Sequence, residues 1–155
     1  QIDWLIENLK ASNANFKIIG AGGQILNPAA IYENYANYAD EREYFLKRLE
    51  EEKVTGVLFL SGDRHHTELT ELPRTDSYPL RDLTVSPLTS GTHAAKDEGN
   101  SLQVKNTLVN DRNFAILDFS GKWGERELAI TIFNQDGKKE WTKTFNLEDF
   151  KPAIK

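Results

Sequence analysis

Residues 57–68 have the sequence Val57-Leu58-Phe59-Leu60-Ser61-Gly62-Asp63-Arg64-His65-His66-Thr67-Glu68. A continuous apolar run is followed here by polar residues whose side chains can bind ligands or take part in catalysis. Continuous hydrophobicity, rather than alternation, is typical of a strand that is covered on both faces, as in α/β sheets. Ligands of open α/β sheets gather beyond the carboxyl ends of the strands. The sequence therefore predicts a buried strand over 57–60 with a candidate site directly after it.

The residues before this strand predict two helices and a second strand. Apolar side chains at 2, 5, 6 and 9 have helical spacing, and a short β-rich run at 16–19 ends at a glycine cluster. A second helix is expected from about 40 to 53, where Asp40 and Glu43 have the spacing of a capping box. The order helix, strand, helix, strand favours a parallel sheet.

The second half of the chain predicts antiparallel strands. A short strand is expected at 83–85, a polar loop from 90 to 100, and a longer strand at 114–119. Alternating apolar residues at 128–132 lead into Asn134-Gln135-Asp136-Gly137, and Asp-Gly between alternating runs is a strong hairpin signal. The predicted fold class is α/β, with a parallel or mixed sheet first and antiparallel strands with a C-terminal hairpin afterwards.

Composition excludes several kinds of function. The 155 residues include 24 acidic and 19 basic side chains, and the net charge of −5 argues against a surface that binds nucleic acid or an anionic membrane. No apolar run approaches the roughly 20 residues of a membrane span. The absence of cysteine excludes disulfides, thiolate metal sites and a cysteine nucleophile. The chain starts inside a predicted helix, so we expect a piece of a longer protein.

The candidate chemistry lies in the segment after the strand. In extended backbone, Asp63 and His65 project to one side, and Arg64 and His66 to the other. A carboxylate and an imidazole on one side, beside Gly62, suit a divalent or trivalent metal ion. The alternative is that Asp63 only caps a turn and that the histidines are solvated.

Two ligands do not complete a metal site, since a metal ion takes four to six ligands and hydrolytic sites often hold two ions roughly 3.5–4 Å apart. The sequence contains no second dense cluster of His and Asp. His93 stands alone in a polar loop near Asp97 and Glu98, and we interpret it as solvated. The remaining ligands are therefore scattered or lie on another segment.

Three segments together resemble the C-terminal part of the alkaline phosphatase D, or PhoD-like, metallophosphatases of the calcineurin-like metallophosphoesterase superfamily. They are Gly-Asp-Arg-His-His-Thr-Glu at 62–68, Leu-Thr-Val-Ser-Pro-Leu-Thr-Ser-Gly at 83–91 and Gln-Ile-Asp-Trp-Leu at 1–5. The resemblance extends from the first helix to about Phe119. It implies half of an α/β/β/α sandwich.

The resemblance also implies roles for individual residues. The last metal motif of the superfamily is Gly-His-x-His, and in the PhoD-like branch Asp takes the place of the first His. Asp63 and His65 occupy these places and are the expected metal ligands. His66 matches a second His of some relatives, with a catalytic, substrate-binding or supporting role, and Arg64 is expected to form a salt bridge or to contact phosphate.

Further expectations concern the surroundings of these ligands. Glu68 or Ser61 is expected to accept a hydrogen bond from the free nitrogen of His65. The superfamily has another ligand after the preceding strand, where this chain has no His. Gln24 is the candidate there for a substrate contact, and the alternative is a plain strand-to-loop turn. The resemblance suggests iron and calcium, or another pair of metal ions, with a phosphate ester as substrate.

The remaining superfamily motifs are absent. Asp63-Arg64-His65 has the form of the first motif, Asp-x-His, but no Gly-Asp-x-x-Asp or Gly-Asn-His-Asp/Glu follows before residue 155. We therefore expect residues 1–155 to be the C-terminal portion of one catalytic domain, inactive without its N-terminal half. An exposed sheet edge then favours homo-oligomers. Family members are commonly exported, so a secreted or envelope location is expected.

Two other functions stay open at this point. The chain would be a non-catalytic, β-rich binding module if Trp4, Trp123 and Trp141, with the five tyrosines, lined a sugar-binding face, although core and cross-strand packing is the commoner explanation for such aromatics. It would be a structural domain without a ligand if residues 63–68 faced bulk water. Metal uptake that depends on Asp63 distinguishes the phosphatase from both.

Overall fold

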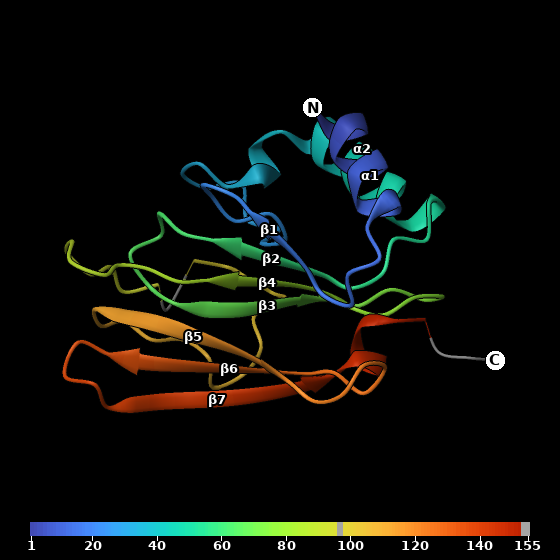
Figure 1. Cartoon of the computed structure of the whole chain (residues 1–155). Coiled ribbons are helices and arrows are strands. Elements are labelled where there is room, and N and C mark those ends of the chain that lie inside the picture. The colour runs from blue at the N-terminus through green and yellow to red at the C-terminus, as the bar shows by residue number, and fades with distance from the viewer. Residues whose placement is uncertain (96–97, 153–155) are drawn as a thin grey trace.

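The computed structural model describes residues 1–95 and 98–152, which form three layers (Figure 1). Two helices lie on one face of a four-stranded sheet, and a three-stranded sheet lies on its other face. In chain order the elements are α1 (Ile2–Ala11), β1 (Lys17–Gly20), η1 (Tyr35–Asn37), α2 (Ala39–Glu51), β2 (Val57–Ser61), β3 (Glu68–Leu72), β4 (Leu80–Thr84), β5 (Asn113–Ser120), β6 (Glu127–Asn134), β7 (Lys139–Asn146) and η2 (Leu147–Phe150). No helix among the described residues is long and apolar enough to cross a membrane.

The first sheet is mixed and has the order β1-β2-β4-β3. Strands β1 and β2 are parallel, with Lys17 opposite Val57, and β2 and β4 are parallel as well. Strand β3 runs antiparallel to β4. The parallel order predicted for the first half is confirmed. Strand β1 forms an edge of this sheet, beside the helices.

The second sheet is antiparallel and has the order β5-β6-β7. The predicted hairpin joins β6 to β7, and Gly137 in its turn has φ = 75°, a left-handed conformation that glycine adopts without steric cost. Every second residue of β6 is buried, beginning with Leu128, so one face of this sheet packs on the core. The predicted α/β class with antiparallel strands in the second half is confirmed.

The alternation of side chains along β2 joins the three layers. The ring of Phe59 meets Phe45 of α2 at 5.9 Å between centroids, whereas Leu60 lines a surface hollow together with Ala115 and Leu117 of β5. Both faces of β2 are thus covered, as its continuous apolar run indicated. Its carboxyl end is fixed firmly in the middle of the sheet.

Two local features differ from the prediction. Strand β3 was not predicted, because its buried positions include Glu68 and Thr70, whose polarity hides the strand in the sequence. Helix α2 has Tyr38 at its N-cap without a side-chain cap, so Asp40 and Glu43 form no capping box. The helix ends at Glu51, with its C-cap at Glu52, close to the predicted end near residue 53.

Candidate metal centre

The loop between β2 and β3 carries the two predicted metal ligands. Asp63 and His65 have φ angles of 66° and 56°, so this segment is not extended, and the alternation of sides predicted from extended backbone is wrong. The two side chains nevertheless line one hollow of about 240 Å³. The loop follows the carboxyl end of β2, and the Gly62 N–H donates to the carbonyl of Gly22, 3.3 Å away, in the loop after β1.

His93 belongs to the same hollow. Its backbone N–H donates to the carbonyl of His65 at 2.8 Å, and its Nε2 contacts the carboxylate of Glu98. Its ring lies 6.0 Å from that of Tyr32, measured between centroids. His93 is therefore not isolated, but its side chain is 43% exposed, so the interpretation of the residue as solvated holds. Nothing in the sequence indicated its place, because 28 positions separate it from His65. Asp97 lies outside the described residues.

Arg64 forms part of the wall of the hollow. Its guanidinium is paired with the carboxylate of Glu98 and lies 4.4 Å from the centroid of the Tyr32 ring. The side chain is only 4% exposed. The salt bridge expected for Arg64 is thus present. Because Glu98 neutralises the guanidinium charge, Arg64 is poorly suited to contact a phosphate group.

His66 points into the protein rather than into the hollow. It is 1% exposed, and its Nδ1 lies 2.9 Å from the carbonyl oxygen of Arg64, to which it donates. Its Nε2 lies 3.7 Å from Oε1 of Glu68. This buried position does not fit the catalytic or substrate-binding role that was one of the options for His66.

The predicted support of His65 was wrong. The carboxylate of Glu68 faces His66 instead, and the hydroxyl of Ser61 donates to Asp82 at 2.7 Å. Among the hydrogen bonds of the described residues, His65 takes part only through its backbone carbonyl. Its ring is therefore left for the hollow.

Gln24 lies beneath the loop and not in the hollow. It is fully buried, and its amide nitrogen donates to Glu68 at 2.6 Å and to Thr84 at 2.8 Å. Its amide oxygen accepts a bond from Asn27 at 2.7 Å. With these partners Gln24 is part of the packing that supports the loop, and its predicted substrate contact has no counterpart in the structure.

Two buried carboxylates of this network have opposite pKa shifts. Burial raises the pKa of Glu68, but His66 and three amide side chains outweigh it, and the pKa is lowered overall. Burial raises the pKa of Asp82, helped by the charge of Glu68, although Ser61 and two backbone N–H groups oppose it. The layer below the loop is thus a dense set of hydrogen bonds around two acids.

The donor set in the hollow fits part of a metal site. The carboxylate of Asp63 and the imidazole of His65, the two predicted ligands, are donors that iron, zinc and similar ions accept. The described residues contain no group of three or more His, Asp or Glu side chains placed to bind one ion. The geometry therefore offers two predicted ligands, and further ones have to come from elsewhere.

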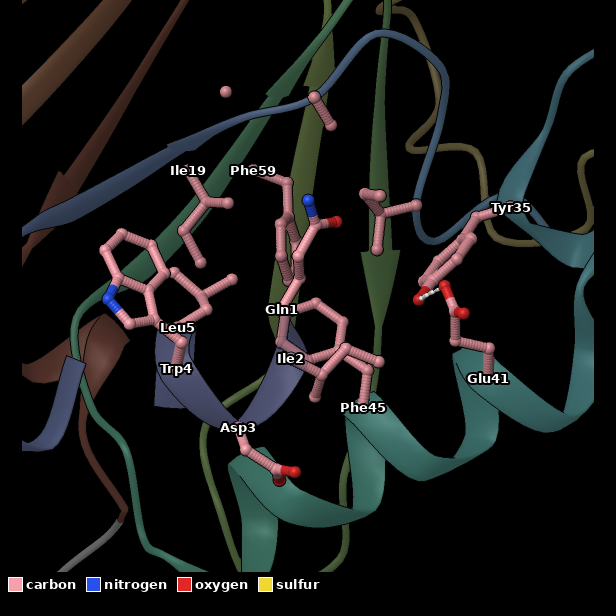
Figure 2. A pocket seen from close by; sticks show the side chains of 13 residues that line it. Gln1, Ile2, Asp3, Trp4, Leu5, Ile19, Tyr35, Glu41, Phe45 and Phe59 are labelled. Atoms are coloured by element: carbon pink, nitrogen blue, oxygen red, sulfur yellow. Dashed lines mark hydrogen bonds between the residues drawn. The ribbon is translucent and has the colours of Figure 1, made fainter. Parts of the chain in front are cut away.

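Another hollow, of about 850 Å³, lies away from this loop, between α1, α2 and the edge strand β1. Figure 2 shows Leu5, Ile19 and Phe59 around it, with Tyr35 donating to Glu41 on one side at 2.8 Å. Its lining is largely apolar and contains no histidine. It is suited to packing rather than to metal chemistry.

Comparison with known proteins identifies the family. The family model of PhoD-like phosphatases matches residues 1–131. The chain belongs to the PhoD-like phosphatase family. The match includes both helices, the first sheet and the loop with Asp63 and His65, and it ends within β6. The family predicted from the three sequence segments is thus confirmed.

A solved structure described as the structure of PhoD shows the same fold. The TM-score is 0.64 with 16% sequence identity, over 89% of this chain and 34% of that one. The chain therefore spans about a third of the length of that PhoD structure. No curated protein matches the chain.

The proposed sugar-binding face finds no support in the positions of the tryptophans. Trp4 lies on α1, Trp123 in the connection between β5 and β6, and Trp141 on β7. The indole N–H of Trp141 donates to the carbonyl of Thr107 at 2.9 Å, which is a packing role. No single helix or strand gathers these side chains, and the phosphatase family replaces the binding module as the basis for function.

Proposed function

We propose that the protein containing this chain hydrolyses phosphate esters with the help of metal ions bound at the loop between β2 and β3. The observation that carries the proposal is the meeting of Asp63 and His65 at one hollow beyond the carboxyl end of a buried parallel strand. Metal ions in such a site polarise the phosphoryl group and make a bound water a stronger nucleophile. Calcium, iron or another pair of ions suits this donor set.

The residues of this chain have distinct tasks in the proposal. Asp63 and His65 supply an oxygen and a nitrogen ligand. His93 faces the same hollow and can donate a hydrogen bond to a phosphate oxygen through its free ring nitrogen. Arg64 keeps the wall of the hollow in place through Glu98 and Tyr32 rather than binding substrate.

The proposal includes a division of the site between two parts of one polypeptide. The chain spans about a third of the similar PhoD structure and offers two predicted ligands, so the others are expected on the N-terminal half of the same domain. The open edge of β1 and the apolar hollow beside it supply a surface for that half. Alone, residues 1–155 are expected to be inactive, and a secreted location stays a prediction from the family.

Metal binding tests the proposal. The absorption of Co²⁺ in the visible range reports binding to the wild-type chain, to Asp63→Ala and to Asp118→Ala, an exposed aspartate on β5 that serves as control. We expect Asp63→Ala to weaken Co²⁺ binding at least roughly tenfold, since a direct ligand is lost, and Asp118→Ala to leave it unchanged.

Equal Co²⁺ affinities for the wild type and Asp63→Ala would contradict the proposed ligand and favour a domain without metal chemistry. Hydrolysis of p-nitrophenyl phosphate by the wild-type chain alone would contradict the divided site. Activity that appears only after the N-terminal half is added would support it.

A further inference from the structure

The loop that carries the predicted metal ligands has an unfavourable backbone. Asp63 and His65 both have positive φ, a region that is uncommon for residues with a Cβ atom and persists where the surroundings support it. The residue between them, Arg64, is buried. Something in the fold must therefore hold two left-handed residues within three consecutive positions.

Two hydrogen bonds hold consecutive peptide groups of this loop. The carbonyl of Arg64 accepts from the Nδ1–H of His66 at 2.9 Å, and the carbonyl of His65 accepts from the backbone N–H of His93 at 2.8 Å. A carbonyl only accepts, so Nδ1 of His66 bears the hydrogen. These bonds fix the peptide planes on both sides of the His65 Cα atom and thus the direction of its side chain.

The ring of His66 is itself held from behind. Its Nε2 is buried without a hydrogen-bond partner among the described residues and lies 3.7 Å from the Glu68 carboxylate. That carboxylate is 1% exposed and accepts bonds from Gln24 at 2.6 Å, from Asn100 at 2.8 Å and from Gln103. Glu68 is anchored on three sides and leaves one side for the imidazole.

We propose that Glu68 and His66 are positioning residues, which hold the loop in the left-handed conformation that turns Asp63 and His65 toward one hollow. The benefit for metal binding rests on the proposed function, but the hold on the backbone does not. His66 is in this proposal neither a metal ligand nor a catalytic residue. Its ring acts through the carbonyl of Arg64 alone.

Two substitutions at position 66 separate this role from general packing. His66→Leu keeps an apolar volume and loses the donor, whereas His66→Asn keeps an amide N–H near the place of Nδ1. Tyr78→Phe is the matched control, because it removes a buried hydroxyl that donates to Val54 and accepts from Val57, each at 3.1 Å, at the end of β2 opposite to the loop. All three variants are compared with the wild type by urea unfolding, by hydrogen exchange of peptides covering 61–68 and by Co²⁺ titration.

We expect His66→Leu to speed exchange in 61–68 and to weaken Co²⁺ binding, each by at least about threefold, the size expected for one lost hydrogen bond. His66→Asn should restore most of the slow exchange and most of the Co²⁺ affinity. Tyr78→Phe should lower the free energy of unfolding without changing the exchange of 61–68 or the Co²⁺ affinity. Glu68→Gln should resemble His66→Leu in direction. The rescue by Asn is the result that a merely space-filling histidine would not give.

Unchanged exchange in 61–68 for His66→Leu, or ring-nitrogen NMR shifts that place no hydrogen on Nδ1 of His66, would overturn the proposal. Loss of Co²⁺ binding with unchanged exchange would do the same. Faster exchange in His66→Leu, together with Co²⁺ binding that is insensitive to Asp63→Ala, would leave the positioning role intact and refute the proposed metal site instead.

Discussion

Glu68 and Asp82 show how strongly single side chains are tuned below the candidate site. Both are buried acids in one network, yet His66 and three amide donors outweigh burial and lower the pKa of Glu68, whereas burial raises the pKa of Asp82. Their contributions to stability therefore depend on pH in opposite directions. Protonation of Glu68 removes stabilisation as the pH falls, while Asp82 favours the folded state in its protonated form.

Replacement of Glu68 by Gln is expected to reduce the loss of stability in acid. The folded pKa of Glu68 is below 4.5, so its stabilisation is fully present above pH 4.5 and is lost as the pH falls through the folded pKa. Urea unfolding at about pH 6 and about pH 3 measures the difference. Glu68→Gln should be less stable than the wild type at the higher pH but should lose less stability between the two.

Glu125→Gln, at an exposed position between β5 and β6, serves as the control and should follow the wild type. If the free energy of unfolding of Glu68→Gln falls between about pH 6 and about pH 3 as much as that of the wild type, titration of Glu68 does not contribute to the loss of stability in acid.

At the residue scale the sequence predicted the place of two candidate ligands, Asp63 and His65, but not the backbone that carries them or most of their neighbours. The buried strand followed by Gly62-Asp63 indicated the place of the candidate ligands. The left-handed backbone at Asp63 and His65 could not be predicted, because only glycine signals positive φ reliably in a sequence. The contacts of His93 with His65 and Glu98 depend on a loop fold that no local pattern encodes.

At the scale of elements, strong local patterns gave correct predictions and tertiary partners explain the failures. The Asp136-Gly137 turn predicted the β6–β7 hairpin, and the apolar run at 57–60 predicted β2. Strand β3 has polar buried residues that are satisfied only by side chains far along the chain, such as Gln24 and Asn100. Such a strand cannot be predicted from its own sequence, because the side chains that satisfy its polar residues come from other segments.

The hairpin gives a direct test of the turn argument. A Cβ atom at Gly137 would meet nothing within 4 Å, so Gly137→Ala costs only conformational energy, about 1 kcal/mol for a left-handed residue. Gly22→Ala is the matched control, because it also meets nothing and has no positive φ, and it should stay within about 0.5 kcal/mol of the wild type. Urea unfolding measures both. Equal effects would show that the turn does not require glycine.

At the scale of the whole molecule, the three layers leave one side of the first sheet open. Strand β1 lies at the edge, and Ile18 on it is 41% exposed. Open edges with apolar side chains pair with other strands, and proteins often block them with lysine. The layers were predictable from the order of helices and strands, but which strand forms the edge follows only from the pairing of β2 with β1 and β4.

We expect residues 1–155 to self-associate through β1 when no N-terminal half covers this edge. Ile18→Lys adds a charge to the edge strand and should shift the population toward the monomer, as measured by light scattering after size-exclusion chromatography over a concentration series. Ile116→Lys is the control, since Ile116 is 50% exposed on β5, an edge of the other sheet. If Ile116→Lys is monomeric and Ile18→Lys still self-associates, the contact lies on β5, and the proposed association through the β1 edge is refuted. Because the same edge is proposed to receive the N-terminal half, addition of that half should dissociate the wild-type oligomer.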